Sequence, residues 1–195
     1  MPEVPFPESV AVTLVVADAL ERLGVPYLIG GSVASTVHGV LRSTLDADLV
    51  ADLHAAQAAP LAEALAGAFY VDAQSIQDAI ARRGSFNVIH LETMFKVDIF
   101  VTRGRPFDQS QFERRAAVTL AAESDRTAFV ASPEDVILAK LEWYRDGGSV
   151  SDRQWRDILG VLMVQAGRLD LDYLRHWAAA LGVSQLLEQA LTEST

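Results

Sequence analysis

Two short motifs in the first third of the chain combine residues that can bind phosphate and metal ions. The first is Gly30-Gly31-Ser32, which follows the apolar run Tyr27–Ile29. Glycines at the end of a strand let backbone amides approach a ligand closely, and Ser32 can begin a helix whose free N–H groups attract an anion. The second motif, Asp46-Ala47-Asp48, comes after thirteen further residues. Its two carboxylates are spaced to meet one cation.

The spacing of Asp46 and Asp48 predicts that both lie on one face of a strand. Over residues 45–52, apolar residues alternate with residues that are mostly acidic. Side chains two residues apart in a strand share a face, with Cα atoms about 6.6 to 6.8 Å apart. Two carboxylates about 4 Å apart repel by on the order of 4 kcal/mol at an effective dielectric constant near 20. A hard divalent cation, with two Mg²⁺ ions favoured and Mn²⁺ as the substitute, relieves that repulsion. The competing interpretation is an ordinary turn, a helix cap at Ser32 and solvated aspartates on an edge strand.

A third acidic residue, Asp98, lies inside the strand-like segment 95–101. The branched apolar residues of this segment share one face, which places Asp98 on the other face together with Lys96. If this strand pairs with the strand of Asp46 and Asp48, the three carboxylates can hold two cations about 3.5 to 4 Å apart. The sequence therefore predicts a three-aspartate metal site, and a surface position for Asp98 is the other interpretation.

The elements that must position these residues follow from hydrophobic periodicity. Apolar residues at spacings of three and four predict a helix over residues 9–23 that leads into the first strand. The short gap between two later strands indicates a hairpin, so the sheet is expected to be mixed. Further helices are expected at 60–68 and 75–83, and further strands at 86–91, 94–101 and 127–131.

From Ser132 onward the pattern is helical. Ser132-Pro133-Glu134-Asp135 combines a cap, a proline at the first helical position and acids in the first turn. We predict an α/β domain over residues 1–131, with a mixed sheet flanked by helices, and a C-terminal helical bundle over residues 132–195 packed on it. The expected helices of this bundle are 133–145, 152–166, 170–181 and 184–191.

These motifs resemble those of the nucleotidyltransferase superfamily typified by DNA polymerase beta, and within it the minimal bacterial and toxin-like members. Such proteins show a Gly-Ser turn on a helix, an Arg and a Thr leading into an Asp-x-Asp strand, and a lone Asp on a later strand. The matching segments are Gly30-Gly31-Ser32, residues 42–49 and the strand of Asp98. Ala47 stands where relatives often have Ile or Leu, which leaves the carboxylates intact.

The resemblance implies a role for each residue. Asp46 and Asp48 would bind both metal ions, and Asp98 would bind the catalytic metal and help to deprotonate the acceptor hydroxyl. The nucleotide-binding residues would be Gly30, Gly31, Ser32 and Arg42.

Two residues of the C-terminal region are similar to a Lys and an Asp that toxin-like relatives direct toward the nucleotide. These are Lys140 and Asp157, on the first two helices expected there. An exposed salt bridge between them, worth about 0 to 1 kcal/mol, explains the same residues equally well.

The implied activity is metal-dependent transfer of a nucleotidyl group from a nucleoside triphosphate to an acceptor hydroxyl, as in a toxin-like enzyme. The acceptor stays open between an RNA end, a protein and a small molecule. Two alternatives use the same residues. One is a non-catalytic nucleotide- or protein-binding module of the same fold, in a toxin–antitoxin or regulatory system with an antitoxin as partner. The other is a phosphate-ester hydrolase with water as acceptor.

Composition excludes several other classes. A chain of 195 residues, 50% of them hydrophobic, can bury one core and a helical lobe. The absence of cysteine excludes disulfides and thiolate zinc sites. Short apolar runs and the lack of a basic leader predict a cytoplasmic protein without a membrane partner. The formal charge of −10 argues against an extensive DNA-binding surface.

Overall fold

The structure is a computed structural model, and it describes residues 8–39, 46–121 and 126–194. The chain divides into two units, one within residues 1–33 and 43–130 and the other within residues 34–42 and 131–195. The first unit holds the described strands, and the second holds the C-terminal helices. The predicted domain boundary after residue 131 stays a prediction, and the second unit also takes in residues 34–42.

The strands of the first unit form one mixed sheet. They are β1 Tyr27–Ile29, β2 Asp46–Ala51, β3 Phe69–Tyr70, β4 Ser85–His90, β5 Lys96–Val101, β6 Ala116–Ala121 and β7 Arg126–Val130. Within the described ranges these seven strands follow the order β3-β4-β5-β2-β1-β7-β6. The pairs β2 with β5 and β1 with β7 are parallel, and the other neighbouring pairs are antiparallel. The predicted mixed sheet and hairpin are confirmed.

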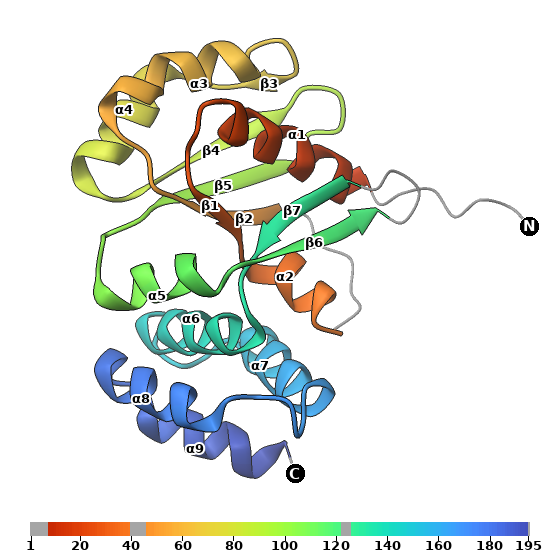
Figure 1. Cartoon of the computed structure of the whole chain (residues 1–195), viewed down its shortest axis with the longest axis vertical. Helices are drawn as coiled ribbons and strands as arrows, with labels where there is room; N and C mark the ends of the chain where they lie inside the picture. Colours follow the sequence, from red (N-terminus) through yellow and green to blue (C-terminus); the bar gives the residue numbers. More distant parts are fainter. Residues whose placement is uncertain (1–7, 40–45, 122–125, 195) are drawn as a thin grey trace, which may run out of the picture. The chain divides into compact units, whose positions relative to one another are not determined.

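Helices accompany the strands in the first unit and make up most of the second. Figure 1 shows α1, α3 and α4 together on one side of the sheet, and α3 contacts both α1 and α4. The bounds are α1 Glu8–Arg22, α2 Gly31–Val37, α3 Ala58–Leu65, α4 Ala73–Arg82, α5 Pro106–Arg114, α6 Pro133–Asp146, α7 Asp152–Val164, α8 Leu171–Leu181 and α9 Ser184–Glu193. A single turn of 3₁₀ helix, Ala55–Gln57, precedes α3. The predicted fold class is confirmed.

Alternating burial distinguishes the two faces of the central strands. In both β2 and β5 every second residue is buried, and the residues between them are half-buried. Ala47 and Leu49 of β2 and Val97 and Ile99 of β5 have no exposed surface. Because strand side chains alternate between faces, the acidic residues of both strands lie on the half-buried face. The apolar core therefore sits on the opposite side of the sheet from the carboxylates.

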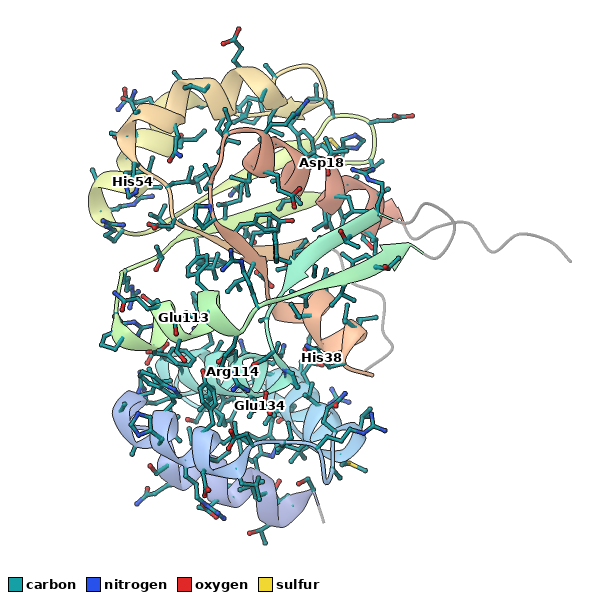
Figure 2. The ribbon with its side chains drawn as sticks, in the orientation of Figure 1. Asp18, His38, His54, Glu113, Arg114 and Glu134 are labelled. Atoms are coloured by element: carbon teal, nitrogen blue, oxygen red, sulfur yellow. The ribbon has the colours of Figure 1, made fainter. Side chains whose placement is uncertain are left out.

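Hydrogen bonds at the start of α6 join it to α8 within the second unit. Ser132 caps α6 by accepting the N–H of Asp135 at 3.2 Å, with Pro133 next to it, so the predicted helix start is confirmed. Glu134, labelled in Figure 2, accepts the N–H of Asp170 at 2.9 Å. The hydroxyl of Tyr173 donates to Asp135 at 2.6 Å. These buried carboxylates are thus satisfied inside the unit.

Two features of the fold differ from what the sequence predicts. The elements α5, β3 and β6 have no counterpart in the sequence prediction. Trp143, whose position on the helix predicted over 133–145 indicates a packing residue, is instead 53% exposed. None of the helices in the described ranges is both long and apolar enough to cross a lipid bilayer.

Candidate functional site

The register of β2 and β5 brings the predicted carboxylates side by side. Asp48 lies opposite Asp98, and Asp46 lies opposite Lys96. Paired residues of neighbouring strands point to the same face, and such strands are about 4.7 to 4.9 Å apart. All four residues are half-buried. The predicted pairing of the two strands is confirmed. Metal binding by the aspartates stays a prediction.

The glycine turn contacts Asp48 directly. The N–H of Gly30 donates to the backbone carbonyl of Asp48 at 2.8 Å. Gly31 has a φ of +53°, and a Cβ added there would lie 1.8 Å from Oδ2 of Asp48. Only glycine leaves room for this carboxyl group while adopting a left-handed backbone. The two motifs of the sequence therefore meet in space, and Ser32, 7% exposed, follows as the second residue of α2.

Lys96 is a functional candidate that the sequence analysis left without a role. Its Nζ lies 2.7 Å from Oδ2 of Asp98, and the two side chains are 41% and 20% exposed. The hydrogen bond to Asp98 raises the pKa of Lys96, burial opposes it, and Coulombic attraction by Asp98, Asp46 and Asp48 adds to the increase. One ammonium group therefore offsets part of the repulsion among three carboxylates. Its place on the acidic face was visible in the sequence, but its partner depends on the strand register.

A neutral polar residue extends the acidic row. Asn87 of β4 lies opposite Asp98 in the antiparallel pair with β5, and opposite residues share a face. Asn87, Asp98 and Asp48 thus follow one another across three strands. The hairpin register depends on the turn at residues 91–95, where Met94 has a φ of 60°. No periodicity in the sequence indicates that register.

The donor set fits a hard divalent cation in chemistry. Carboxylate oxygens, which Mg²⁺ prefers, come from adjacent strands on a half-buried face. Among the residues that the structure describes, no three His, Asp or Glu side chains converge as a preformed metal site would require. Oδ2 of Asp98 is directed to Lys96 instead. Lys96 thus occupies one of the two carboxylate oxygens of Asp98 that a metal ion could otherwise use.

The remaining predicted residues lie elsewhere in the chain. Arg42 falls outside the described residues. Lys140 and Asp157 belong to the second unit and pair with each other, with 2.9 Å between Nζ and Oδ2. Their side chains are 11% and 6% exposed, so the alternative interpretation of an exposed salt bridge is wrong in that the pair is buried. Their contact with a nucleotide stays a prediction.

Solved structures with the same architecture are adenylyltransferases and a nucleotidyltransferase-like protein. The antigenic nucleotidyltransferase-like protein from Paracoccidioides brasiliensis has a TM-score of 0.55 at 18% identity, over 97% of this chain and 95% of that one. ANT(2″)-Ia in complex with adenylyl-2″-tobramycin has a TM-score of 0.58 at 12% identity, over 88% and 95% of the two chains. This chain has the nucleotidyltransferase fold.

A further structure with the nucleotidyltransferase fold is the lincosamide antibiotic adenylyltransferase LnuA, bound to lincomycin. Its TM-score is 0.51 at 17% identity, over 80% of this chain and 96% of that one. The sequence matches no protein-family model and no curated protein sequence. The likeness is therefore one of fold, and membership of a toxin-like branch stays a prediction.

Proposed function

We propose that this protein is a divalent-metal-dependent nucleotidyltransferase. It would move a nucleotidyl group from a nucleoside triphosphate to an acceptor hydroxyl and release pyrophosphate. The observation that carries the proposal is the register that sets Asp48 opposite Asp98, with Asp46 on the same face. The nucleotidyltransferase fold supports the same conclusion.

Each residue of the site has a distinct part in this proposal. Asp46, Asp48 and Asp98 would hold the metal ions. When bound, the ions would neutralise charge on the triphosphate and lower the pKa of the acceptor hydroxyl. Asp98, once released from Lys96, would accept the proton of that hydroxyl. The N–H of Gly30 holds the backbone of Asp48, and Gly31, which has no side chain, leaves room for its carboxyl group beside the glycine turn.

The nucleotide would lie against the glycine turn. The backbone amides of Gly31 and Ser32 would hold its phosphates, with Arg42 as an added positive charge. These groups would orient the triphosphate so that the acceptor hydroxyl can attack its α-phosphate in line with the leaving pyrophosphate. Lys140 and Asp157 are the further residues proposed to face the nucleotide.

The acceptor class proposed first is a small molecule with a free hydroxyl group. ANT(2″)-Ia and LnuA carry an adenylylated aminoglycoside and a lincosamide in their structures. An RNA end and a protein hydroxyl are the other acceptors. A protein acceptor would correspond to a toxin-like enzyme, with an antitoxin as its partner.

One observation favours a second candidate function. Lys96 engages Asp98, and no three acidic or histidine side chains in the described ranges converge on a metal position. In a non-catalytic nucleotide- or protein-binding module, Lys96 could stay paired with Asp98, because no metal ion would have to bind there. Such a module need not show Mg²⁺-dependent thermal stabilisation by triphosphates. A thermal-shift panel of the four nucleotides with and without Mg²⁺ therefore separates the two candidates.

The proposed function is tested by following label from α-phosphate-labelled ATP, GTP, CTP and UTP into three acceptor pools. The pools are a panel of aminoglycosides and lincosamides, total RNA, and protein extract. We expect Mg²⁺-dependent label in one pool, and none with Asp48→Asn at an unchanged or higher melting temperature in metal-free buffer. Asp52→Asn is the matched control, because Asp52 lies four residues along the same chain segment, about 13 Å away in extended backbone. No label in any pool, or equal label with Asp48→Asn, would contradict the proposal.

A further inference from the structure

Lys96 is the cationic side chain that the structure places in the acidic row of β2 and β5. Its Nζ is 2.7 Å from Oδ2 of Asp98, within the range of a charge-assisted hydrogen bond. Asp46 lies opposite it on β2, and the apolar Ile89 lies opposite it on β4. The ammonium group therefore has acidic neighbours on one side and an apolar neighbour on the other.

We propose that Lys96 is a resident counter-cation that a divalent ion must displace from Asp98, so that Lys96 sets the metal affinity of the site. This inference rests on the proposed function and adds a residue to it that the aspartate motifs do not include. Lys96 would be a positioning residue, because it acts on the metal ion through Asp98.

The geometry allows such an exchange. The side chain of Lys96 is 41% exposed, so it has open space to move into. Lysine carries a compact charge on a flexible stem and forms no rigid bidentate pair, unlike arginine. Asp98 is 20% exposed and thus open to an ion from solvent. An ammonium group and a divalent ion held by the same carboxyl group, even on its two different oxygens, would lie only a few ångström apart and would repel each other.

The two roles of the lysine have opposite consequences when it is removed. Without a metal ion, loss of Lys96 leaves three carboxylates to repel one another, so the protein loses stability. With a metal ion, the same loss removes a competitor and a repelling charge, so binding becomes tighter. Lys96 lies beside Asp98 and opposite Asp46, and Asp48 lies opposite Asp98, so the ammonium group stands among the carboxylates that a cation would engage. A merely structural ion pair would not produce tighter metal binding.

The test is calorimetric titration of Mn²⁺ into the full-length protein at about 0.15 M salt. Lys96→Gln is expected to bind Mn²⁺ about tenfold more tightly than the wild type. The repulsion between two unit charges about 4 Å apart in water changes a binding constant about fivefold, and the double charge of Mn²⁺ makes the change larger. The mobility of an exposed lysine makes it smaller, which leaves an effect of about tenfold. Lys96→Arg keeps the charge, so it should bind Mn²⁺ no more tightly than the wild type.

Arg126→Gln is the matched control for loss of a positive charge. Arg126 of β7 also pairs with an aspartate, Asp18, and its side chain is 39% exposed. In the sheet, β2 and β1 separate β7 from β5, so it lies roughly 14 Å from β5. That separation exceeds the Debye length of about 8 Å at this ionic strength. Its Mn²⁺ affinity should equal that of the wild type.

A second measurement needs no variant at Lys96. Acetylation of the wild type, read by mass spectrometry, should modify Lys96 faster when Mn²⁺ is present, because the ammonium group has left Asp98. Lys140, buried in its pair with Asp157, serves as the internal reference and should not change.

The outcomes separate this inference from the proposed function. Equal or weaker binding by Lys96→Gln, with binding still lost in Asp48→Asn, would overturn the role of Lys96 and leave the metal site standing. Unchanged acetylation of Lys96 on Mn²⁺ binding would overturn it as well. If neither the wild type nor Lys96→Gln binds Mn²⁺, the metal site fails and this inference fails with it.

Discussion

Replacing Gly31 by alanine is expected to disrupt the contact between the glycine turn and Asp48. Gly31 has a φ of +53°, and a Cβ there would lie 1.8 Å from Oδ2 and 2.6 Å from Cγ of Asp48. A left-handed backbone costs a non-glycine residue roughly 1 to 2 kcal/mol. Forcing extra atoms into a packed contact adds about 1 to 3 kcal/mol. We therefore expect the free energy of unfolding to fall by about 2 to 5 kcal/mol.

Gly24→Ala is the matched control for this variant. Gly24 has a φ of +64°, and a Cβ added there would meet nothing within 4 Å. It carries the backbone penalty without the clash, so its cost should be about 1 to 2 kcal/mol. The difference between the two variants measures the contact with Asp48.

A double variant isolates the same contact. Adding Asp48→Ala to Gly31→Ala removes the two nearest atoms but leaves Cβ of Asp48 2.8 Å from the added Cβ. The double variant should therefore recover only part of the roughly 1 to 3 kcal/mol that the clash costs, because the two positions share one contact. Urea unfolding is best followed by circular dichroism, since the described strands lie in the first unit and the three tryptophans lie after residue 131. If Gly31→Ala lowers the free energy of unfolding no more than Gly24→Ala does, or if the double variant recovers nothing, Gly31 and Asp48 do not share the close contact described.

Two further predictions concern other buried polar groups. Asp157→Ala should lower the free energy of unfolding by about 3 to 5 kcal/mol, because it leaves the ammonium group of Lys140 buried without its partner. The double variant Lys140→Met with Asp157→Leu should lose less stability than either single change. Urea unfolding read by tryptophan fluorescence checks this, and additive losses would contradict it. Burial and the hydrogen bond to Glu21 raise the pKa of Tyr27 above its ordinary value of 10.0, so above that pH the unfolded chain releases a proton that the folded chain keeps, and stability falls as pH rises. Between about pH 8 and pH 11 the wild type should lose up to roughly 1.4 kcal/mol more than Tyr27→Phe, and equal losses in urea unfolding would contradict this.

Elements with a strong local pattern were predictable. The apolar spacing over 9–23 and the cap at Ser132 depend only on neighbouring residues, and α1 and α6 begin within a residue or two of the predicted positions. The helix α5 has few apolar residues, and Asp108 instead accepts backbone N–H groups of the preceding loop. The strand β6 begins with two alanines, which are weak strand formers, and it lies at the sheet edge. Its pairing with β7 is a tertiary effect.

In the candidate site, too, local features were predictable from the sequence and contacts between separate elements were not. The shared face of Asp46 and Asp48 follows from a period of two, so the sequence was sufficient. The packing of Gly31 against Asp48 joins residues of separate elements, and glycine alone indicates only a turn. The pairing of Lys140 with Asp157 spans seventeen residues and two helices. For these pairs the sequence supplies the residue types, and tertiary packing decides which of them meet.

If the three aspartates support transfer of a nucleotidyl group, the α-phosphate of the nucleotide must become attached to the acceptor. The most direct measurement is the fate of label from α-phosphate-labelled and γ-phosphate-labelled triphosphate in parallel reactions with the acceptor. We expect α-label in the product, γ-label in released pyrophosphate, and neither with Asp48→Asn. Label from the γ-phosphate in the product, nucleoside monophosphate as the sole α-labelled product, or unchanged transfer by Asp48→Asn would rule out aspartate-supported nucleotidyl transfer.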